Sequence, residues 1–191
     1  MNDMFPNFKK WEQLSPKEKN AYATDMAVMA GMLEAMDYHI GRYVNYLKDT
    51  FIIHEAQRYN LRGKQILGAE RKYYLNDLAF KNLLFGFYPE DIGYQLENFV
   101  FLELKRKGYK VMVGVLGVKE VDFVATKADK TIYIQVAYLL SEAKTVEREF
   151  GNLLSIHDNF EKIVVSLDDA QFSNYQGIKH IKPWELGKFL D

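Results

Sequence analysis

Three polar residues in the second half of the chain have the types and the order to hold a divalent cation. Glu97 borders an apolar helical pattern, Asp122 lies in a strand pattern, and Gln135 lies in the next strand pattern. Side chains alternate between the two faces of a strand, so paired strands would put Asp122 and Gln135 on one face, opposite Ile134 and Val136. Mg²⁺ takes one or two carboxylates plus waters. The sequence therefore predicts an acidic cleft in which Asp122 and Glu97 hold Mg²⁺ weakly, if at all.

A helix must bring Glu97 to this cleft. Pro89-Glu90-Asp91 supplies start signals, and Gly108 supplies a stop signal. Between them, apolar residues recur every four positions, at Ile92, Leu96, Val100 and Leu104. Because Glu97 lies beside this stripe, we expect its carboxylate to face the sheet that the helix covers.

Strand patterns follow the helix and complete an α/β core. Short connections at Gly117 and at Ala128-Asp129-Lys130 predict an antiparallel meander. Ser141 is expected to cap a helix that ends near Leu154, and the crossover then leads to a parallel strand. The expected strands are 110–115, 119–126, 131–138, 162–167 and a short one at 177–181, with a closing helix from Pro183. Residues 91–191 are thus predicted to form an αβββαβ core with a mixed sheet.

The first segment, residues 1–42, is predicted to be helical. Ser15 can cap a helix, with Pro16 at its first position. Apolar residues then recur at spacings of three and four, at Tyr22, Met26, Met29, Leu33, Met36, Ile40 and Val44. Packing of this face on the rest of the chain is the favoured interpretation. A pliable, Met-rich docking surface is the alternative.

Residues 43–90 have the outline of a winged-helix-like region. A helix end is followed by a strand pattern at 51–56, a basic turn at 60–64 and a second strand pattern at 72–75. Arg62 and Lys64 lie at the tip of this wing, and Arg58 lies nearby. These three residues are the candidate nucleic-acid-binding residues, since such a wing can contact phosphates. Charges that protect a sheet edge from aggregation are the alternative interpretation.

The order of Glu97, Asp122 and Gln135 on an αβββαβ skeleton resembles the PD-(D/E)XK, or restriction-endonuclease-like, superfamily. Four segments also resemble the C-terminal domain of unknown function of prokaryotic AAA-type ATPases. They are Tyr73–Leu78, Gln95–Asn98, Lys119–Val124 and Ile134–Tyr138, and the similarity extends over about residues 43–191. For the metal-dependent nucleases of this superfamily, the resemblance implies an active-site pattern of three groups. These are an Asp, a second acid, and a Lys two residues beyond that acid.

The chain departs from that nuclease pattern. Gln135-Val136-Ala137 stands where the pattern has Glu-X-Lys, so a neutral amide replaces a ligand and a methyl group replaces the ammonium. Lys144 or Arg148 on the next helix is a candidate for a migrated cation. We therefore expect Glu97, Asp122 and Gln135 to form a vestigial site. The phosphate-loop motif G-x-x-x-x-G-K-[ST] is also missing, so the resemblance extends to no ATPase module within this sequence.

Composition sets the remaining bounds. The 191 residues include 25 basic and 26 acidic side chains, for a net charge of −1, so any attraction to nucleic acid must be local. There is no cysteine, and no run of apolar residues is long enough to span a membrane. We expect a cytoplasmic protein that is not associated with a membrane.

Two functions fit these observations. The preferred one is a non-enzymatic interaction module with a degenerate nuclease-like fold, whose partner is nucleic acid, another protein or an AAA-type ATPase module. The alternative is a Mg²⁺-dependent nuclease with a degenerate active site.

Overall fold

The computed structural model describes residues 9–140, 143–169 and 174–191 and has the expected mixed α/β fold. The chain divides into two compact units, Met1–Asp49 and Thr50–Asp191. The boundary expected at residues 42–43 therefore falls inside a helix, and residues 50–90 belong to the same unit as the α/β core. Ser141, expected to cap a helix, lies outside the described residues.

In the part of the first unit that the structure describes, a short 3₁₀ turn, η1 (Trp11–Gln13), precedes one long helix, α1 (Pro16–Asp49). Ser15 and Glu18 start α1 with reciprocal hydrogen bonds: Ser15 N donates to Glu18 Oε2 over 2.8 Å, and Glu18 N donates to Ser15 Oγ over 3.3 Å. None of the residues of α1 is buried, and its apolar stripe is exposed from Tyr22 to Ile40. No helix in the described part of the chain combines the length and the apolar character needed to cross a bilayer.

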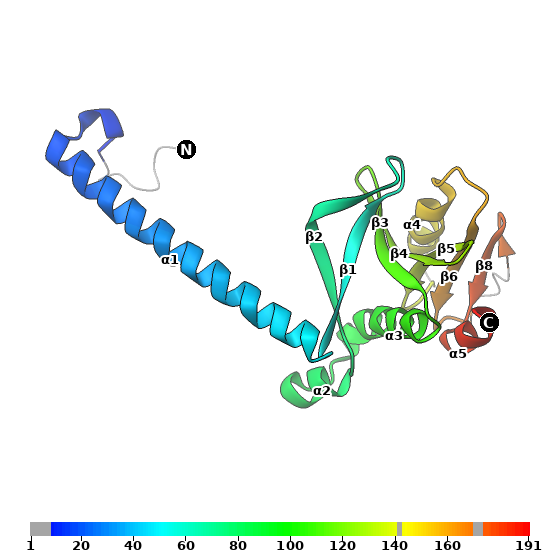
Figure 1. Cartoon of the computed structure of the whole chain (residues 1–191). Coiled ribbons are helices and arrows are strands. Elements are labelled where there is room, and N and C mark those ends of the chain that lie inside the picture. The colour runs from blue at the N-terminus through cyan, green and yellow to red at the C-terminus, as the bar shows by residue number, and fades with distance from the viewer. Residues whose placement is uncertain (1–8, 141–142, 170–173) are drawn as a thin grey trace. The chain divides into compact units, whose positions relative to one another are not determined.

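The second unit is built on a twisted, eight-stranded mixed sheet among the described residues (Figure 1), with the strand order β2-β1-β3-β4-β5-β6-β8-β7. The strands are β1 (Ile53–Asn60), β2 (Gln65–Leu75), β3 (Lys110–Leu116), β4 (Lys119–Lys127), β5 (Lys130–Ala137), β6 (Glu161–Ser166), β7 (Asn174–Tyr175) and β8 (Ile178–Ile181). The predicted meander is confirmed, because β3, β4 and β5 pair antiparallel and β6 pairs parallel to β5.

The hairpin of β1 and β2 is present, and it extends the sheet. Its strands are longer than predicted, and β1 pairs parallel to β3 from Arg58↔Val113 to Asn60↔Val115. The end of β1 thus reaches the end of β3. This pairing brings the basic turn at Leu61–Lys64 close to the β3–β4 turn at Gly117.

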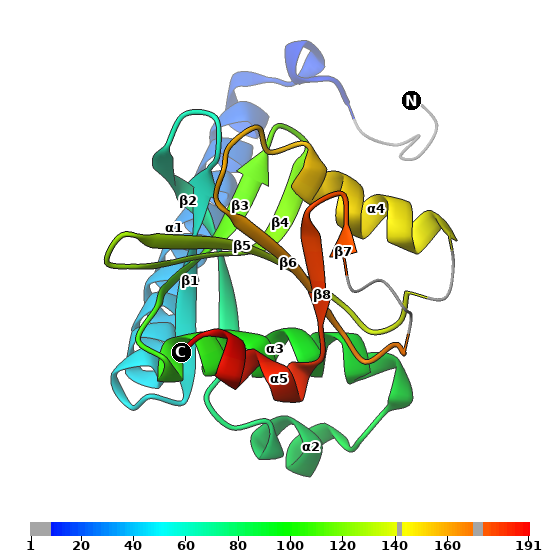
Figure 2. The ribbon, with the colours of Figure 1, turned by 90° about the vertical axis from the view of Figure 1, so that its right-hand side faces the viewer.

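Helices cover both faces of the sheet (Figure 2). On one face α3 (Ile92–Arg106) and α5 (Pro183–Phe189) pack over a core that includes Phe101, Phe123 and Ile134. On the other face α4 (Ala143–Leu154) packs over a core that includes Val121 and Phe150. A short helix, α2 (Ala79–Phe85), and a 3₁₀ turn, η2 (Pro89–Asp91), lead from the hairpin into α3.

A bulge interrupts the strict alternation along β4. Met112 pairs with Val124, whereas Gly114 pairs with Val121, so Asp122 and Phe123 together oppose a single residue of β3. As a result Val121 and Phe123, expected on one face, lie in the cores of opposite faces. A Cβ at Gly114 would lie 3.1 Å from Cβ of Val121, so a side chain at this position would require its neighbours to shift.

Candidate functional site

The Glu97 carboxylate lies under the sheet, as predicted from its place beside the apolar stripe of α3. Its side chain is 18% exposed. The Tyr74 hydroxyl donates a 2.7 Å hydrogen bond to Glu97 Oε1, and Lys72 Nζ lies 3.3 Å from the same oxygen. Tyr74 itself stacks on Phe101, with ring centroids 4.1 Å apart. The Glu97 carboxylate is thus held by two side chains of β2.

Lys72 connects Glu97 to a second acid. Its Nζ lies 2.6 Å from Glu120 Oε1, and the Arg58 guanidinium donates a 2.7 Å hydrogen bond to Glu120 Oε2. Burial lowers the pKa of Lys72, but the hydrogen bond to Glu120 and the charges of Glu97, Glu120 and Asp122 outweigh it, so that the pKa is raised. Lys72 therefore stays positively charged between two carboxylates.

Asp122 lies close enough to Glu97 for the two carboxyl groups to affect each other. Burial raises the pKa of Asp122 to about 8, and the negative charge of Glu97 adds to this effect. A hydrogen bond from the backbone amide of Val136 and the charge of Lys72 act in the opposite direction. Near neutral pH, Asp122 is accordingly a largely protonated acid.

Gln135 does not join Glu97 and Asp122 as the strand pattern predicts. By alternation it shares a face with Tyr133 and Ala137, which lie in the core under α4. The Gln135 side chain is buried, and its Oε1 has no hydrogen-bond partner among the described residues. The opposite face is as expected, because Ile134 is fully buried under α3 and Val136 packs partly against the same core.

Ala137, which stands where the nuclease pattern has a lysine, borders an open hollow. Ala137, Glu97, Arg148 and Glu149 line this hollow, whose volume is about 430 Å³. The Arg148 guanidinium donates a 2.8 Å hydrogen bond to Glu149 Oε1, so an acid already pairs with its charge. The side chain of Lys144, the other candidate for a migrated cation, lies outside the described part.

Together these groups make a poor metal site. Within residues 9–140, 143–169 and 174–191, no three His, Cys, Asp or Glu side chains come together as metal ligands. A ligand carboxylate must be ionised, whereas the Asp122 pKa is about 8. Glu97 already accepts hydrogen bonds from the Tyr74 hydroxyl and the Lys72 ammonium group.

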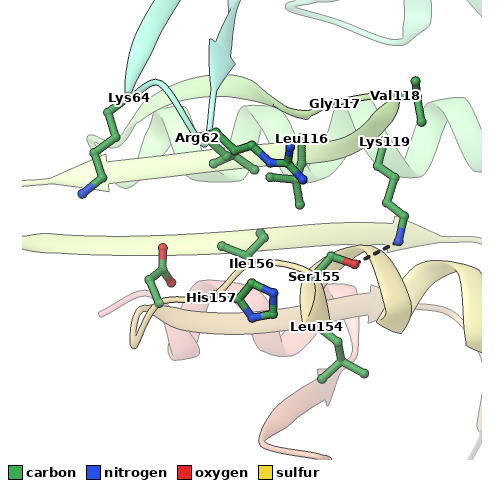
Figure 3. Close-up of a pocket in the computed structure, with 12 residues that line it drawn as sticks. Arg62, Lys64, Leu116, Gly117, Val118, Lys119, Leu154, Ser155, Ile156 and His157 are labelled. Atoms are coloured by element: carbon green, nitrogen blue, oxygen red, sulfur yellow. Dashed lines mark hydrogen bonds between the residues drawn. The ribbon is translucent and has the colours of Figure 1, made fainter.

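A second site lies at the tip of the β1–β2 hairpin, where a hollow of about 790 Å³ opens between three connections (Figure 3). Arg62 and Lys64 come from the hairpin turn, Lys119 comes from the start of β4, and His157 comes from the connection after α4. Apolar side chains form the rest of the lining, at Leu61, Leu116, Val118, Leu154 and Ile156.

The charge around this hollow is positive and is not balanced by acids. Arg62 and Lys64 are exposed and form no ion pair within the described residues. Lys119 Nζ donates a 2.9 Å hydrogen bond to the Ser155 hydroxyl, which leaves its charge uncompensated. Asp158 is an acidic residue of the lining, and its carboxylate already accepts a 2.7 Å hydrogen bond from the Tyr133 hydroxyl and a 3.2 Å bond from Lys162.

The three predicted phosphate-binding residues are therefore in two different situations. Arg62 and Lys64 lie at the hollow. Arg58 lies away from the tip, with its side chain 23% exposed and paired with Glu70 and Glu120. Its charge is paired with acids of β2 and β4.

Sequence reasoning missed four residues that shape these sites. Lys72 and Tyr74 alternate along β2, so their spacing predicts a shared face, and Tyr74 is buried in the core next to Glu97. Lys119 and His157 join the hollow only because β1 pairs with β3 and α4 ends beside the β3–β4 turn. No local pattern indicates those contacts.

Comparison with known proteins finds uncharacterized relatives. An uncharacterized protein of Haemophilus influenzae is 37% identical over 152 residues, which cover 78% of this chain and 37% of that protein. An uncharacterized protein of Methanocaldococcus jannaschii is 30% identical over 170 residues, which cover 80% of this chain and 37% of that protein. The chain thus matches a little over a third of the length of each relative. No protein-family model matches it. No solved structure matches it either.

Proposed function

We propose that this chain is a non-enzymatic nucleic-acid-binding module, and that the tip of the β1–β2 hairpin contacts phosphates. The observation that carries the proposal is the pair of exposed cations, Arg62 and Lys64, at the rim of a hollow with no free acid among its described lining residues. Lys119 and His157 extend the same rim. Contacts from lysine and arginine to phosphates supply most of the affinity of sequence-independent binding.

The state of the acidic groups favours binding over cleavage. Metal-assisted hydrolysis needs ionised ligands and a positioned group that activates water. Here Asp122 has a raised pKa of about 8, Glu97 is held by Tyr74 and Lys72, and Ala137 replaces the lysine of the nuclease pattern. The alternative function, a Mg²⁺-dependent nuclease with a degenerate site, is less well supported for this reason.

A relation to the C-terminal region of AAA-type ATPases is part of the same proposal. The ordered segments Tyr73–Leu78, Gln95–Asn98, Lys119–Val124 and Ile134–Tyr138 support it. In such a protein, an ATPase module would be the natural protein partner of this chain. The relatives are longer than the region that they share with it, which is compatible with additional modules in those proteins.

Binding of labelled single-stranded DNA, double-stranded DNA and RNA, measured by fluorescence anisotropy at several salt concentrations, tests the proposal. The variant is Arg62→Ala with Lys64→Ala. We expect weaker binding to all sequences alike, because phosphate contacts carry no base information. For double-stranded DNA the slope of log K against log salt should become shallower by roughly 2, since each lost phosphate contact lowers it by about 0.9.

A matched control removes the same charge from the opposite end of β4. Lys127→Ala with Lys130→Ala changes two exposed lysines of the β4–β5 turn and should leave both affinity and salt slope near the values of the unmodified protein. If the two double variants weaken binding equally, binding depends on the net charge of the chain and not on the hairpin tip. If the unmodified chain binds none of the three nucleic acids at low salt, the proposal is wrong.

A further inference from the structure

We infer that α1 is a self-association surface, along which two copies of the chain pair in parallel as a coiled coil. The observation is a stripe of exposed side chains, here named the α1 seam, whose members follow one another at alternating spacings of four and three residues. The seam consists of Tyr22, Met26, Met29, Leu33, Met36, Ile40 and Tyr43. Their exposed fractions lie between 46% at Tyr22 and 67% at Met26.

This spacing selects another helix as the partner. In the seven-residue repeat, Met26, Leu33 and Ile40 occupy one core position, called a. The other core position, called d, is filled by Tyr22, Met29, Met36 and Tyr43. A strict repeat of seven keeps such a stripe facing a second helix that has the same repeat, and the pair winds into a left-handed supercoil. A second copy of α1 has that repeat by identity.

The charges on α1 are compatible with pairing to itself. No residue of the seam is charged. In a parallel, in-register pair, a residue that flanks the seam on one copy lies opposite the residue five positions later on the other copy. Asp25 then faces Ala30, and Met32 faces Asp37. No two like charges oppose each other at these positions, so nothing in this part of the helix selects against a second copy.

The seam is also long enough for a stable interface. With a rise of about 1.5 Å per residue, the stretch from Tyr22 to Tyr43 is about 32 Å long. A buried aromatic side chain covers roughly 150–250 Å², so the two tyrosines with five Met, Leu and Ile side chains reach the roughly 800 Å² per partner of a standard interface. Most of the stability of helices in proteins comes from packing of their apolar face, which a second copy of α1 would supply.

The mass of the full chain, measured by sedimentation equilibrium over a range of concentrations, tests this inference. The seam variant is Leu33→Glu with Ile40→Glu. The matched control, Val28→Glu with Tyr38→Glu, makes the same kind of change at exposed apolar positions of the same helix outside the seam. We expect the unmodified chain and the control to be dimeric, and the seam variant to be monomeric with an intact second unit by near-ultraviolet circular dichroism.

Three outcomes would overturn the inference. They are an unmodified chain that is monomeric at all concentrations, equal loss of association in the seam and control variants, and a monomer that binds vesicles of anionic lipid through α1 instead. Orientation has its own test, because the chain has no cysteine. Met36→Cys should form a disulfide-linked dimer on mild oxidation in a parallel pair, whereas an antiparallel pair would leave this thiol unlinked.

Discussion

Asp122 Oδ2 accepts a 2.8 Å hydrogen bond from the backbone amide of Val136, at the end of the ladder between β4 and β5. Pairing of the two strands runs from Lys127↔Lys130 only as far as Phe123↔Ile134. Beyond that point the Asp122 side chain supplies the acceptor that a neighbouring strand would otherwise provide. The carboxyl group thus has a structural role at the place where the nuclease pattern needs a metal ligand.

Replacing Asp122 by asparagine should therefore flatten the dependence of stability on pH. An aspartate in the unfolded chain has a pKa of about 4, whereas burial raises the pKa of Asp122 to about 8 in the folded chain. Between these values the folded state keeps a proton that the unfolded state loses, so the free energy of unfolding falls as the pH rises from about 4 to about 8. The side-chain amide of the Asp122→Asn variant would keep an acceptor for Val136 without a charge.

Urea unfolding at about pH 5 and about pH 9 measures this effect. The gain of the Asp122→Asn variant over the unmodified protein should increase between these two pH values by on the order of 4 kcal/mol, because the interval from pH 5 to the folded pKa of about 8 spans about three pH units at about 1.4 kcal/mol each. Asp129→Asn, an exposed aspartate in the β4–β5 turn, is the control. If the free energy of unfolding depends on pH in the same way for Asp122→Asn and the unmodified protein, the raised pKa of Asp122 in the folded chain is contradicted.

Removing the Tyr74 hydroxyl should destabilise the fold without disturbing the aromatic packing. Tyr74→Phe keeps the stack on Phe101 but takes away the hydrogen bond to Glu97. Hydrogen bonds to charged groups contribute about 1.5–3 kcal/mol, and we expect a loss of this size in the free energy of unfolding. Tyr73→Phe, whose side chain is 47% exposed, should change it by less than about 0.5 kcal/mol. Equal effects at the two positions would show that Glu97 does not depend on Tyr74.

Asn98 should be as important as Tyr74 to the end of β2. Its Oδ1 accepts a 2.8 Å hydrogen bond from Leu75 N, and its Nδ2 donates a 2.8 Å bond to Leu75 O. Asn98→Ala leaves both backbone groups without their partner, and each unsatisfied buried group costs about 1–3 kcal/mol. Asn98→Asp keeps the acceptor alone and should lie between the alanine variant and the unmodified protein in urea unfolding. An alanine variant with unchanged stability would mean that water replaces the side chain.

The α/β core could be predicted from sequence because its signals are local. Short stretches rich in apolar residues define β3, β4 and β5, and the turns between them lie at Gly117 and Ala128, both of which have positive φ. The parallel pairing of β6 follows from the length of the crossover. Such patterns depend only on neighbours in the chain.

Two features of the site could not be predicted in this way. The bulge at Asp122 changes which residues of β4 share a face, and its only local sign is Gly114 on the opposite strand. The joining of β1 to β3 is a pairing between residues more than fifty positions apart, and it brings Lys72 and Tyr74 to Glu97. Glu97 and Asp122 lie close enough for their charges to interact, as the pattern predicts, and the cation that contacts Glu97 is Lys72 of β2.

We expect no hydrolysis of single- or double-stranded DNA or RNA above background in the presence of Mg²⁺ or Mn²⁺. A missing acid–base group typically lowers the rate 10²–10⁴-fold, and the chain lacks both the charged ligand at Gln135 and the lysine at Ala137. Ala137→Lys places an ammonium at the hollow that Glu97 and Glu149 line, and Gln135→Glu adds a carboxylate two residues earlier on the same strand, at a buried position.

Metal-dependent cleavage should be measured for four proteins. They are the unmodified chain, Asp122→Ala, the double variant that restores both groups, and that double variant with Asp122→Ala added. Metal-dependent cleavage by the restored variant that disappears with Asp122→Ala would indicate that the site is vestigial and lost its activity with Gln135 and Ala137. Cleavage by the unmodified chain that also depends on Asp122 would contradict the proposed binding function. Lys72 would then be the first cation to replace, because its Nζ already lies 3.3 Å from Glu97 Oε1 and its charge acts on Asp122.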